Sequence, residues 1–210
     1  MNQKNGKNSL GIDICFEDLD NPIELFKNWF SKAEESEIND PNAVAVATSN
    51  KDNQPNVRMV LLKGLSDRGF VFYTNFNSQK GNEIKENQKA SMCFHWKSLR
   101  RQVRAIGLIE EVSKKEADDY FNSRPYKNKI GAWASSQSKI LDKRETFLKK
   151  IKEFEKKYPD EKNVPRPPHW SGWRLLPDEI EFWLDGEGRI HERLNYRKNN
   201  SKWEKELLYP

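Results

Sequence analysis

The feature that most constrains the fold is a series of short segments with strand-like patterning, separated by turn residues. Such segments occupy residues 42–49, 56–64, 70–76, 90–96, 101–112, 172–177, 179–186, 189–196 and 203–210. Gly, Asn, Asp and Ser fill many of the gaps, which is typical of hairpin connections. Strands and helices do not alternate in the βαβ pattern of a doubly wound sheet. The sequence therefore predicts a mainly β (α+β) fold, an antiparallel barrel with helices outside it.

Helix signals interrupt this series. Asn21 is an N-cap candidate followed by Pro22, after which apolar residues recur at helical spacing at Ile23, Phe26, Phe30 and Ala33. Further helices are predicted at residues 79–87, from a capping box at 113–116 to residue 121, around Trp133, and at 142–158. Residues 1–20 show no periodicity, so we expect a flexible N-terminal arm followed by one domain over residues 21–210.

Composition and charge exclude several classes of protein. The chain has 210 residues and a net charge of +5, which suits one domain and permits an anionic ligand without requiring one. Its two cysteines, Cys15 and Cys93, supply neither a disulfide framework nor a zinc site, and we expect no metal. No signal-peptide or membrane-spanning pattern is present, so a cytoplasmic location is expected. No GxGxxG or Walker motif supports a dinucleotide or NTP site.

Basic residues alternate with other residues in the stretch RIHERLNY (189–196). If this stretch is a β-strand, Arg189, His191 and Arg193 share one face. Neighbouring basic groups repel one another unless a negative group lies across them. The spacing also fits a solvated strand face neutralised by Glu187 and Glu192, so by itself it only suggests a phosphate ligand.

Other basic residues collect at strand ends and helix starts. Ser78 and Lys80 lie where a hydroxyl, free backbone N–H groups and a helix N-terminus would bind an anion, although Ser78 would serve equally as an ordinary helix cap. Arg58 and Lys63 have opposite parity on one strand, so only a bulge would bring both to one ligand. Spacing therefore indicates phosphate binding at a barrel edge without naming the ligand.

Several motifs occur together in a fixed order: RMVLLK (58–63), FYTN (72–75), SQKG (78–81), RQVR (101–104), YFNSRP (120–125), IGAWASSQS (130–138), IEFW (180–183) and RIHER (189–193). Together they resemble the pyridoxamine 5′-phosphate oxidase family over about residues 21–210. The resemblance implies a split antiparallel β-barrel homodimer that binds two FMN molecules at its interface. It also implies oxidation of pyridoxamine and pyridoxine 5′-phosphates to pyridoxal 5′-phosphate, with O2 as acceptor and release of H2O2, and of ammonia from the amine.

The same resemblance assigns residues to the site. It implies that the flavin is lined by Arg58, Met59, Val60, Leu61, Leu62, Lys63, Tyr73, Thr74, Gln79, Lys80, Gln102, Gln137, Ser138, Trp183 and Arg193, with Arg58 on the flavin phosphate. It implies that the substrate is held by Lys63, Tyr120, Arg124, Asn128, Arg189 and His191. Arg189 and His191 are the catalytic candidates, expected to orient the reacting carbon.

The sequence departs from the family pattern in three places. Gln79 stands where an Arg is usual, Asn128 replaces a common Ser, and the arm before Asn21 lacks the Arg-Arg-x-Tyr stretch that often covers the substrate. Two other functions are compatible with a β-barrel of this kind. Another flavin oxidoreductase on the same barrel is disfavoured by Tyr120, Arg124, Arg189 and His191. An RNA-binding barrel is disfavoured because the aromatic residues follow core periodicity, so neither nucleic acid nor membrane is an expected partner.

Overall fold

The computed structural model describes residues 6–210, and within them the sheet is nine-stranded and antiparallel throughout. The strands run in the order β2-β1-β5-β6-β7-β4-β3, and β8 pairs with both β7 and β9. Their bounds are β1 Ala43–Ser49, β2 Pro55–Leu61, β3 Gly64–Ser66, β4 Gly69–Asn75, β5 Lys89–Trp96, β6 Arg101–Glu111, β7 Trp170–Leu184, β8 Glu192–Asn199 and β9 Lys202–Leu207. The predicted succession of antiparallel strands is thus confirmed.

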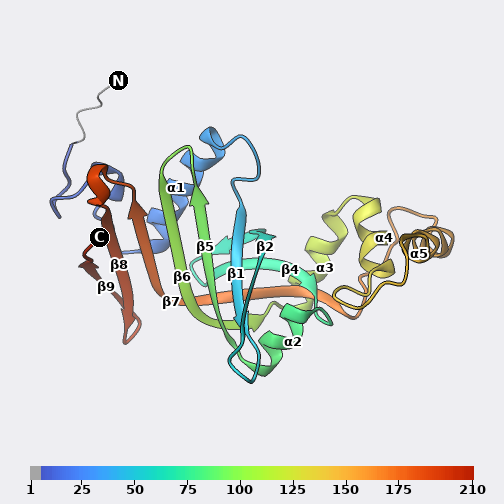
Figure 1. Cartoon of the computed structure of the whole chain (residues 1–210). Coiled ribbons are helices and arrows are strands. Elements are labelled where there is room, and N and C mark those ends of the chain that lie inside the picture. The colour runs from blue at the N-terminus through green and yellow to red at the C-terminus, as the bar shows by residue number, and fades with distance from the viewer. Residues whose placement is uncertain (1–5) are drawn as a thin grey trace.

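Strand β7 connects the two ends of the molecule. One of its edges pairs with β6, and its other edge is divided between β4, on residues 170–175, and β8, on residues 179–184. Figure 1 shows β7 running from the side of α3 and α4 to the side of β8 and β9. A side chain near the start of β7 and one near its end therefore lie at opposite ends of the sheet.

The prediction of two separate strands, 172–177 and 179–186, was wrong, because both belong to β7. Pro177 lacks a backbone N–H and normally interrupts a ladder. Here the register shifts between Ile106 and Gly107, so that Gly107 pairs with Pro177 and Ile106 with Glu179. This bulge absorbs Asp178 and lets the strand continue. A Cβ on Gly107 would lie 2.0 Å from the carbonyl oxygen of Leu176, so only glycine fits this close approach.

The helices flank the sheet as predicted. They are α1 Pro22–Ser36, α2 Gln79–Glu86, α3 Lys114–Ser123, α4 Tyr126–Ala134 and α5 Arg144–Lys157, with short 3-10 turns at Ile14–Phe16 and Glu187–Arg189. The side chains of Asn21, Ser78 and Ser113 accept the capping hydrogen bonds of α1, α2 and α3. No helix in residues 6–210 is long and apolar enough to cross a membrane.

An aromatic core fills the space between α1 and the sheet. Phe26 of α1 is fully buried, and its ring centroid lies 4.9 Å from those of both Phe70 and Phe94. Trp29, one turn further along α1, packs edge-on against Phe182 at 5.2 Å. Truncation of such a ring to alanine costs about 3–5 kcal/mol of unfolding free energy. This core fixes the scaffold from which the functional side chains project.

Residues 6–20 of the expected flexible N-terminal arm pack against the domain. Phe16 is fully buried, and its ring centroid lies 5.3 Å from that of Trp29. The indole N–H of Trp29 donates to the carbonyl of Cys15 at 2.7 Å, and the hydroxyl of Tyr196 donates to the carbonyl of Leu19 at 2.8 Å. A single anchoring side chain such as Phe16 produces no periodic pattern, so the sequence did not reveal this packing. Residues 1–5 of the expected arm lie outside the described residues.

Candidate functional site

A cleft of about 500 Å³ lies where the end of β2, strand β4, the start of α2 and the turn between α3 and α4 come together. Its lining brings together residues from segments far apart in the sequence: Met59, Val60, Leu61, Lys63, Tyr73, Thr74, Lys80, Tyr120, Ser123, Arg124, Pro125, Asn128, Gln137 and Trp170. Most of these are residues that the sequence predicted for a flavin or its substrate. The fold therefore gathers one large part of the predicted site.

One wall of the cleft is aromatic. The ring of Tyr73 stacks on that of Tyr120, with centroids 3.9 Å apart, and is nearly parallel to Trp170 at 5.4 Å. Tyr73 lies opposite Gly172 on β7, where a Cβ would come within 2.7 Å of its ring, so the glycine makes room for the tyrosine. Burial raises the pKa of Tyr73 to about 12, so its phenol stays neutral at physiological pH.

The polar part of the lining is cationic. It contains Lys63, Lys80 and Arg124, and no Asp or Glu among its described residues. Lys80 is buried, and its Nζ lies 3.2 Å from Oγ1 of Thr74 and 3.3 Å from Oε1 of Gln137. Burial, with a further contribution from Arg58, lowers the pKa of Lys80. Clustered cations without a carboxylate are the arrangement that binds an anion.

Arg124 has a donor that no described residue uses. It follows α3 as its C-cap residue, and Pro125 after it is the N-cap residue of α4. Its guanidinium carbon lies 4.6 Å from the Trp170 ring centroid, while its Nη1 is buried without a hydrogen-bond partner in residues 6–210. A buried charged donor without a partner costs free energy of folding, so we expect a ligand to place an acceptor beside this atom.

Three predicted residues lie beside the cleft rather than in its lining. Arg58 is bound to Glu83 of α2, with Nη2 and Oε2 3.1 Å apart. Gln79 is exposed at the first position of α2, and Ser138 is exposed just after Gln137. Arg58 lies within strand β2, whereas Lys63 lies beyond its last residue, Leu61. The alternation of faces that would separate the two side chains on a regular strand therefore does not apply to Lys63.

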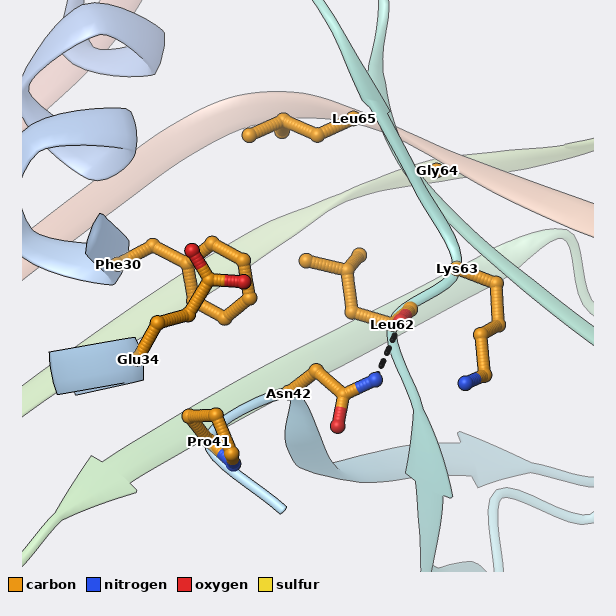
Figure 2. A pocket seen from close by; sticks show the side chains of 8 residues that line it. All are labelled: Phe30, Glu34, Pro41, Asn42, Leu62, Lys63, Gly64 and Leu65. Carbon is orange, nitrogen blue, oxygen red and sulfur yellow. Dashed lines mark hydrogen bonds between the residues drawn. The ribbon is translucent and has the colours of Figure 1, made fainter. Parts of the chain in front are cut away.

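Leu62 faces a different pocket, of about 430 Å³, between α1 and the segment that joins β2 to β3. Figure 2 shows Leu62 and Leu65 extending toward Phe30 of α1. The side chain of Asn42 donates to the carbonyl of Leu62 at 3.0 Å, and the backbone N–H of Lys63 donates to the carbonyl of Val71 at 2.8 Å. These bonds fix the backbone that presents Lys63 to the cleft.

The remaining predicted residues form a second cluster at the far end of β7. Trp183 pairs with Gln102 of β6 on one side and with Arg193 of β8 on the other. Nε of Arg193 donates to Oε1 of Glu181 at 2.8 Å, and its Nη1 donates to the carbonyl of Tyr209 at 2.8 Å. We call Gln102, Trp183, Arg189, His191 and Arg193 the distal cluster.

The prediction that Arg189, His191 and Arg193 share a strand face was wrong. Strand β8 begins at Glu192, and Arg189 ends the 3-10 turn Glu187–Arg189 with a φ of 65°. His191 lies against Trp183 with ring centroids 4.6 Å apart, and its Nδ1 is 3.1 Å from Oδ1 of Asp185. The 3-10 turn overlaps the DGEG stretch (185–188) and extends one residue beyond it, to Arg189, which alternation in the sequence does not reveal. The three residues are neighbours without sharing a strand.

The cleft and the distal cluster are well separated within one chain. Tyr73 pairs with Gly172, whereas the distal cluster surrounds Trp183 on the same strand. At about 3.3 Å per residue, these two positions are roughly 36 Å apart along β7. One chain therefore does not bring all the predicted site residues together.

Sequence reasoning missed two parts of this region. Trp170, the third ring of the aromatic wall, follows a Pro-rich stretch and was not among the predicted site residues. Glu83, which holds Arg58, lies on the buried face of α2. Glu83 could have been identified as a carboxylate on the side of the predicted helix that faces the sheet. No local pattern distinguished Trp170.

Comparison with known proteins places both parts of the chain in related families. Residues 30–158 match the family described as pyridoxamine 5′-phosphate oxidase. Residues 170–210 match the region described as the pyridoxine 5′-phosphate oxidase C-terminal dimerisation region. The second match contains most of the distal cluster.

Relatives of nearly the same length carry one name. The chain is 58% identical over 207 residues to a pyridoxine/pyridoxamine 5′-phosphate oxidase of Pelagibacter ubique, covering 98% of this chain and 100% of that protein. It is 53% identical over 197 residues to the protein of that name from Sinorhizobium fredii, covering 93% of this chain and 95% of that one.

Solved structures share the fold. PhzG from Burkholderia lata, in complex with tetrahydrophenazine-1-carboxylic acid, superposes with a TM-score of 0.88 at 29% identity, over 98% of this chain and 100% of that one. A pyridoxamine 5′-phosphate oxidase-related, FMN-binding protein from Nostoc punctiforme has a TM-score of 0.72 at 17% identity, over 90% and 98%. The predicted split antiparallel barrel with flanking helices is confirmed by these likenesses.

Proposed function

The chain belongs to the pyridoxamine 5′-phosphate oxidase family, and from that premise we propose that its cleft is one half of an FMN site shared between two copies of the chain. The protein is an oxidase that converts pyridoxamine 5′-phosphate and pyridoxine 5′-phosphate to pyridoxal 5′-phosphate. O2 is the acceptor and H2O2 is released, together with ammonia when the amine is the substrate.

The residues present fit both phosphorylated ligands. FMN and the substrate are phosphate monoesters with close to two negative charges each, and the cleft offers Lys63, Lys80 and Arg124 without a carboxylate. We assign Lys80, with Thr74 and Gln137 around its ammonium group, to the flavin. We assign Lys63, Tyr120, Arg124 and Asn128 to the substrate phosphate. The unpaired Nη1 of Arg124 is the single observation that supports an anionic ligand most directly.

A second copy would complete the site. Register places Leu61 and Met59 of β2 on the same face of the sheet as Gln102, Trp183 and Arg193, the face opposite the aromatic core. Val57 and Met59 on this face are 69% and 63% exposed in the single chain. An isologous dimer that covers the face brings the cleft of one copy to the distal cluster of the other. The match of residues 170–210 to a dimerisation region supports this arrangement.

Each part then has a task in the reaction. When bound, FMN would supply the two-electron acceptor that no side chain provides. Arg124 and Lys63 hold the substrate by its phosphate, which leaves the ring in a defined position. Arg189 and His191 from the second copy orient the reacting carbon, His191 being held by its contacts with Trp183 and Asp185. Hydride transfer needs positioning more than proton removal, so we assign no obligatory general base.

Mixing two inactive variants tests whether the site is shared. Arg124→Ala damages the cleft and Arg193→Ala damages the distal cluster, so each homodimer should be poorly active. After the two proteins are dissociated and reassociated together, half of the dimers are mixed, and each mixed dimer has one intact site. Roughly a quarter of wild-type aldehyde production should return, as expected for a two-fold dimer. No recovery, with mixed dimers shown by mass spectrometry, would mean that each site belongs to one chain.

A further inference from the structure

Arg58 is held from behind by a buried carboxylate. Its Nη2 lies 3.1 Å from Oε2 of Glu83, whose side chain is only 5% exposed. Oε1 of Glu83 accepts from the side chain of Asn56 at 2.7 Å, and its Oε2 accepts from the hydroxyl of Thr48. Nη1 of Arg58 donates to Oγ1 of Thr48. Arg58 and Glu83 are therefore joined directly, and also through Thr48.

Glu83 is ionised in this network. Burial disfavours its charged form, but the hydrogen bonds from Thr48 and Arg58 outweigh burial and hold the pKa of Glu83 below its usual value. A buried ion pair gains little net stability, because desolvation offsets the attraction between the charges. Stabilisation of the fold alone is therefore a weak explanation for the pair.

The geometry leaves part of Arg58 available. A guanidinium has five N–H donors, and the described bonds use those of Nη1 and one of Nη2. Nε and the second Nη2 proton remain without a partner in residues 6–210. On α2, Glu83 comes three residues after Lys80, which lines the cleft. The network thus connects Arg58 to the helix that also carries the flavin lysine.

We propose that Glu83 is a positioning residue that fixes the guanidinium of Arg58 so that its free donors meet the phosphate of FMN. This inference rests on the proposed FMN site. Glu83 does not touch the flavin itself, so its effect reaches the ligand only through Arg58. The phosphate should depend on Glu83, whereas the flavin ring should not.

Binding of FMN and of riboflavin, which lacks the phosphate, separates these effects. The full-length protein is stripped of flavin, and quenching of flavin fluorescence gives both dissociation constants. Glu83→Gln keeps the shape of the side chain but removes its charge, and it should weaken FMN binding about tenfold while leaving riboflavin binding unchanged. Thr48→Val, which removes the bridging hydroxyl, should cause the same phosphate-specific loss to a smaller extent. Glu86→Gln, at an exposed position of the same helix, is the matched control.

Arg58→Ala distinguishes failure of this inference from failure of the FMN site. Arg58→Ala should itself weaken FMN binding, and Glu83→Gln should then cause no additional loss in the Arg58→Ala background. Two results would overturn the role of Glu83 but leave the FMN site standing. One is an equal loss of affinity for FMN and for riboflavin in Glu83→Gln. The other is unchanged FMN affinity in Glu83→Gln when Arg58→Ala binds FMN more weakly. Wild-type FMN affinity in Arg58→Ala would overturn the phosphate contact of Arg58, and the role of Glu83 with it.

Discussion

The rings of Tyr73 and Tyr120 stack with centroids 3.9 Å apart and an interplanar angle of 16°, and they join strand β4 to helix α3 along one wall of the cleft. We assign Tyr73 to the flavin and Tyr120 to the substrate phosphate, so this contact links the two binding sites. A change at Tyr120 that keeps the ring should therefore act on the substrate alone.

Tyr120→Phe preserves the stack but removes the hydroxyl. Loss of a hydrogen bond to a charged group costs about 1.5 kcal/mol or more, so we expect KM for pyridoxine 5′-phosphate to rise about tenfold. Turnover at saturation and FMN affinity should remain near wild type. Tyr120→Ala should also weaken FMN, because Tyr73 loses its stacking partner. Steady-state kinetics and flavin titration measure both effects, and an unchanged KM in Tyr120→Phe would remove Tyr120 from the substrate site.

Arg193→Ala tests the distal cluster. Removal of a charge-assisted contact should cost roughly 1.5–3 kcal/mol of FMN affinity. The fold should survive, because Glu181 loses the contact of its Oε1 with Arg193 but keeps the ion pair of its Oε2 with Nη2 of Arg104 at 2.6 Å. Arg197→Ala, on the same strand and in an exposed ion pair with Glu179, is the control and should have little effect. Equal FMN affinity in the two variants would contradict the assignment of Arg193.

Several of these elements could be predicted from the sequence because their causes are local. Asn21 and Pro22 start α1, and the strands that pair through hairpins follow one another in the sequence. Strand β7 could not be predicted as one element, because the bulge opposite Pro177 depends on Gly107, about seventy residues earlier in the chain. The break before Glu192 was missed because the φ of 65° at Arg189 is uncommon for a residue other than glycine.

In the candidate site, too, features with local causes could be predicted, whereas features that depend on long-range pairing could not. The resemblance named residues of the cleft and of the distal cluster as one site, and the fold separates them along β7. Pairing of Trp183 with Arg193, or of Tyr73 with Gly172, is a long-range property that periodicity does not encode. Glu83 illustrates the converse case. Its helix was predicted, but its contact with Arg58 depends on how α2 packs against β1 and β2.

Gln79→Arg should strengthen flavin binding. Gln79 is exposed at the start of α2, next to Lys80, where the helix dipole already favours an anion. An added charge there should tighten FMN binding and make it more dependent on salt, because ions screen exposed charges. Gln88→Arg adds the same charge just beyond the other end of α2 and serves as the control. Titrations at low and high salt make the comparison, and unchanged FMN affinity at low salt would show that another group already compensates for Gln79.

FMN affinity should depend on pH through Lys80. Burial and Arg58 lower the pKa of Lys80 in the free protein, whereas a bound phosphate favours its charged form. Binding should therefore weaken as pH rises through this lowered pKa, and should also weaken below about pH 6, where the phosphate gains a proton. Lys80→Arg stays charged throughout and should lose the alkaline weakening. If the alkaline limb persists in Lys80→Arg, another group causes it.

Variants of Arg189 and His191 should separate catalysis from cofactor binding. Arg189 is exposed in the turn Glu187–Arg189, and His191 rests on Trp183 beside Asp185, so neither side chain supports the core. Arg189→Leu and His191→Asn should each leave a folded, yellow dimer. Turnover should nevertheless fall about a hundredfold in the more affected variant, because a misplaced ring seldom reaches the reactive geometry.

The arginine change should do more harm than the histidine change. Arg189→Leu removes a permanent charge and a flat guanidinium suited to stacking on a pyridine ring, whereas Asn at position 191 retains a hydrogen-bonding group. Glu187→Gln, an exposed change in the same turn, controls for disturbance of the backbone there. Steady-state kinetics, with flavin content measured by absorbance, make the comparison. Near-normal turnover in both variants would mean that these residues only cover a solvated turn, and the substrate would then have to be oriented by the cleft alone.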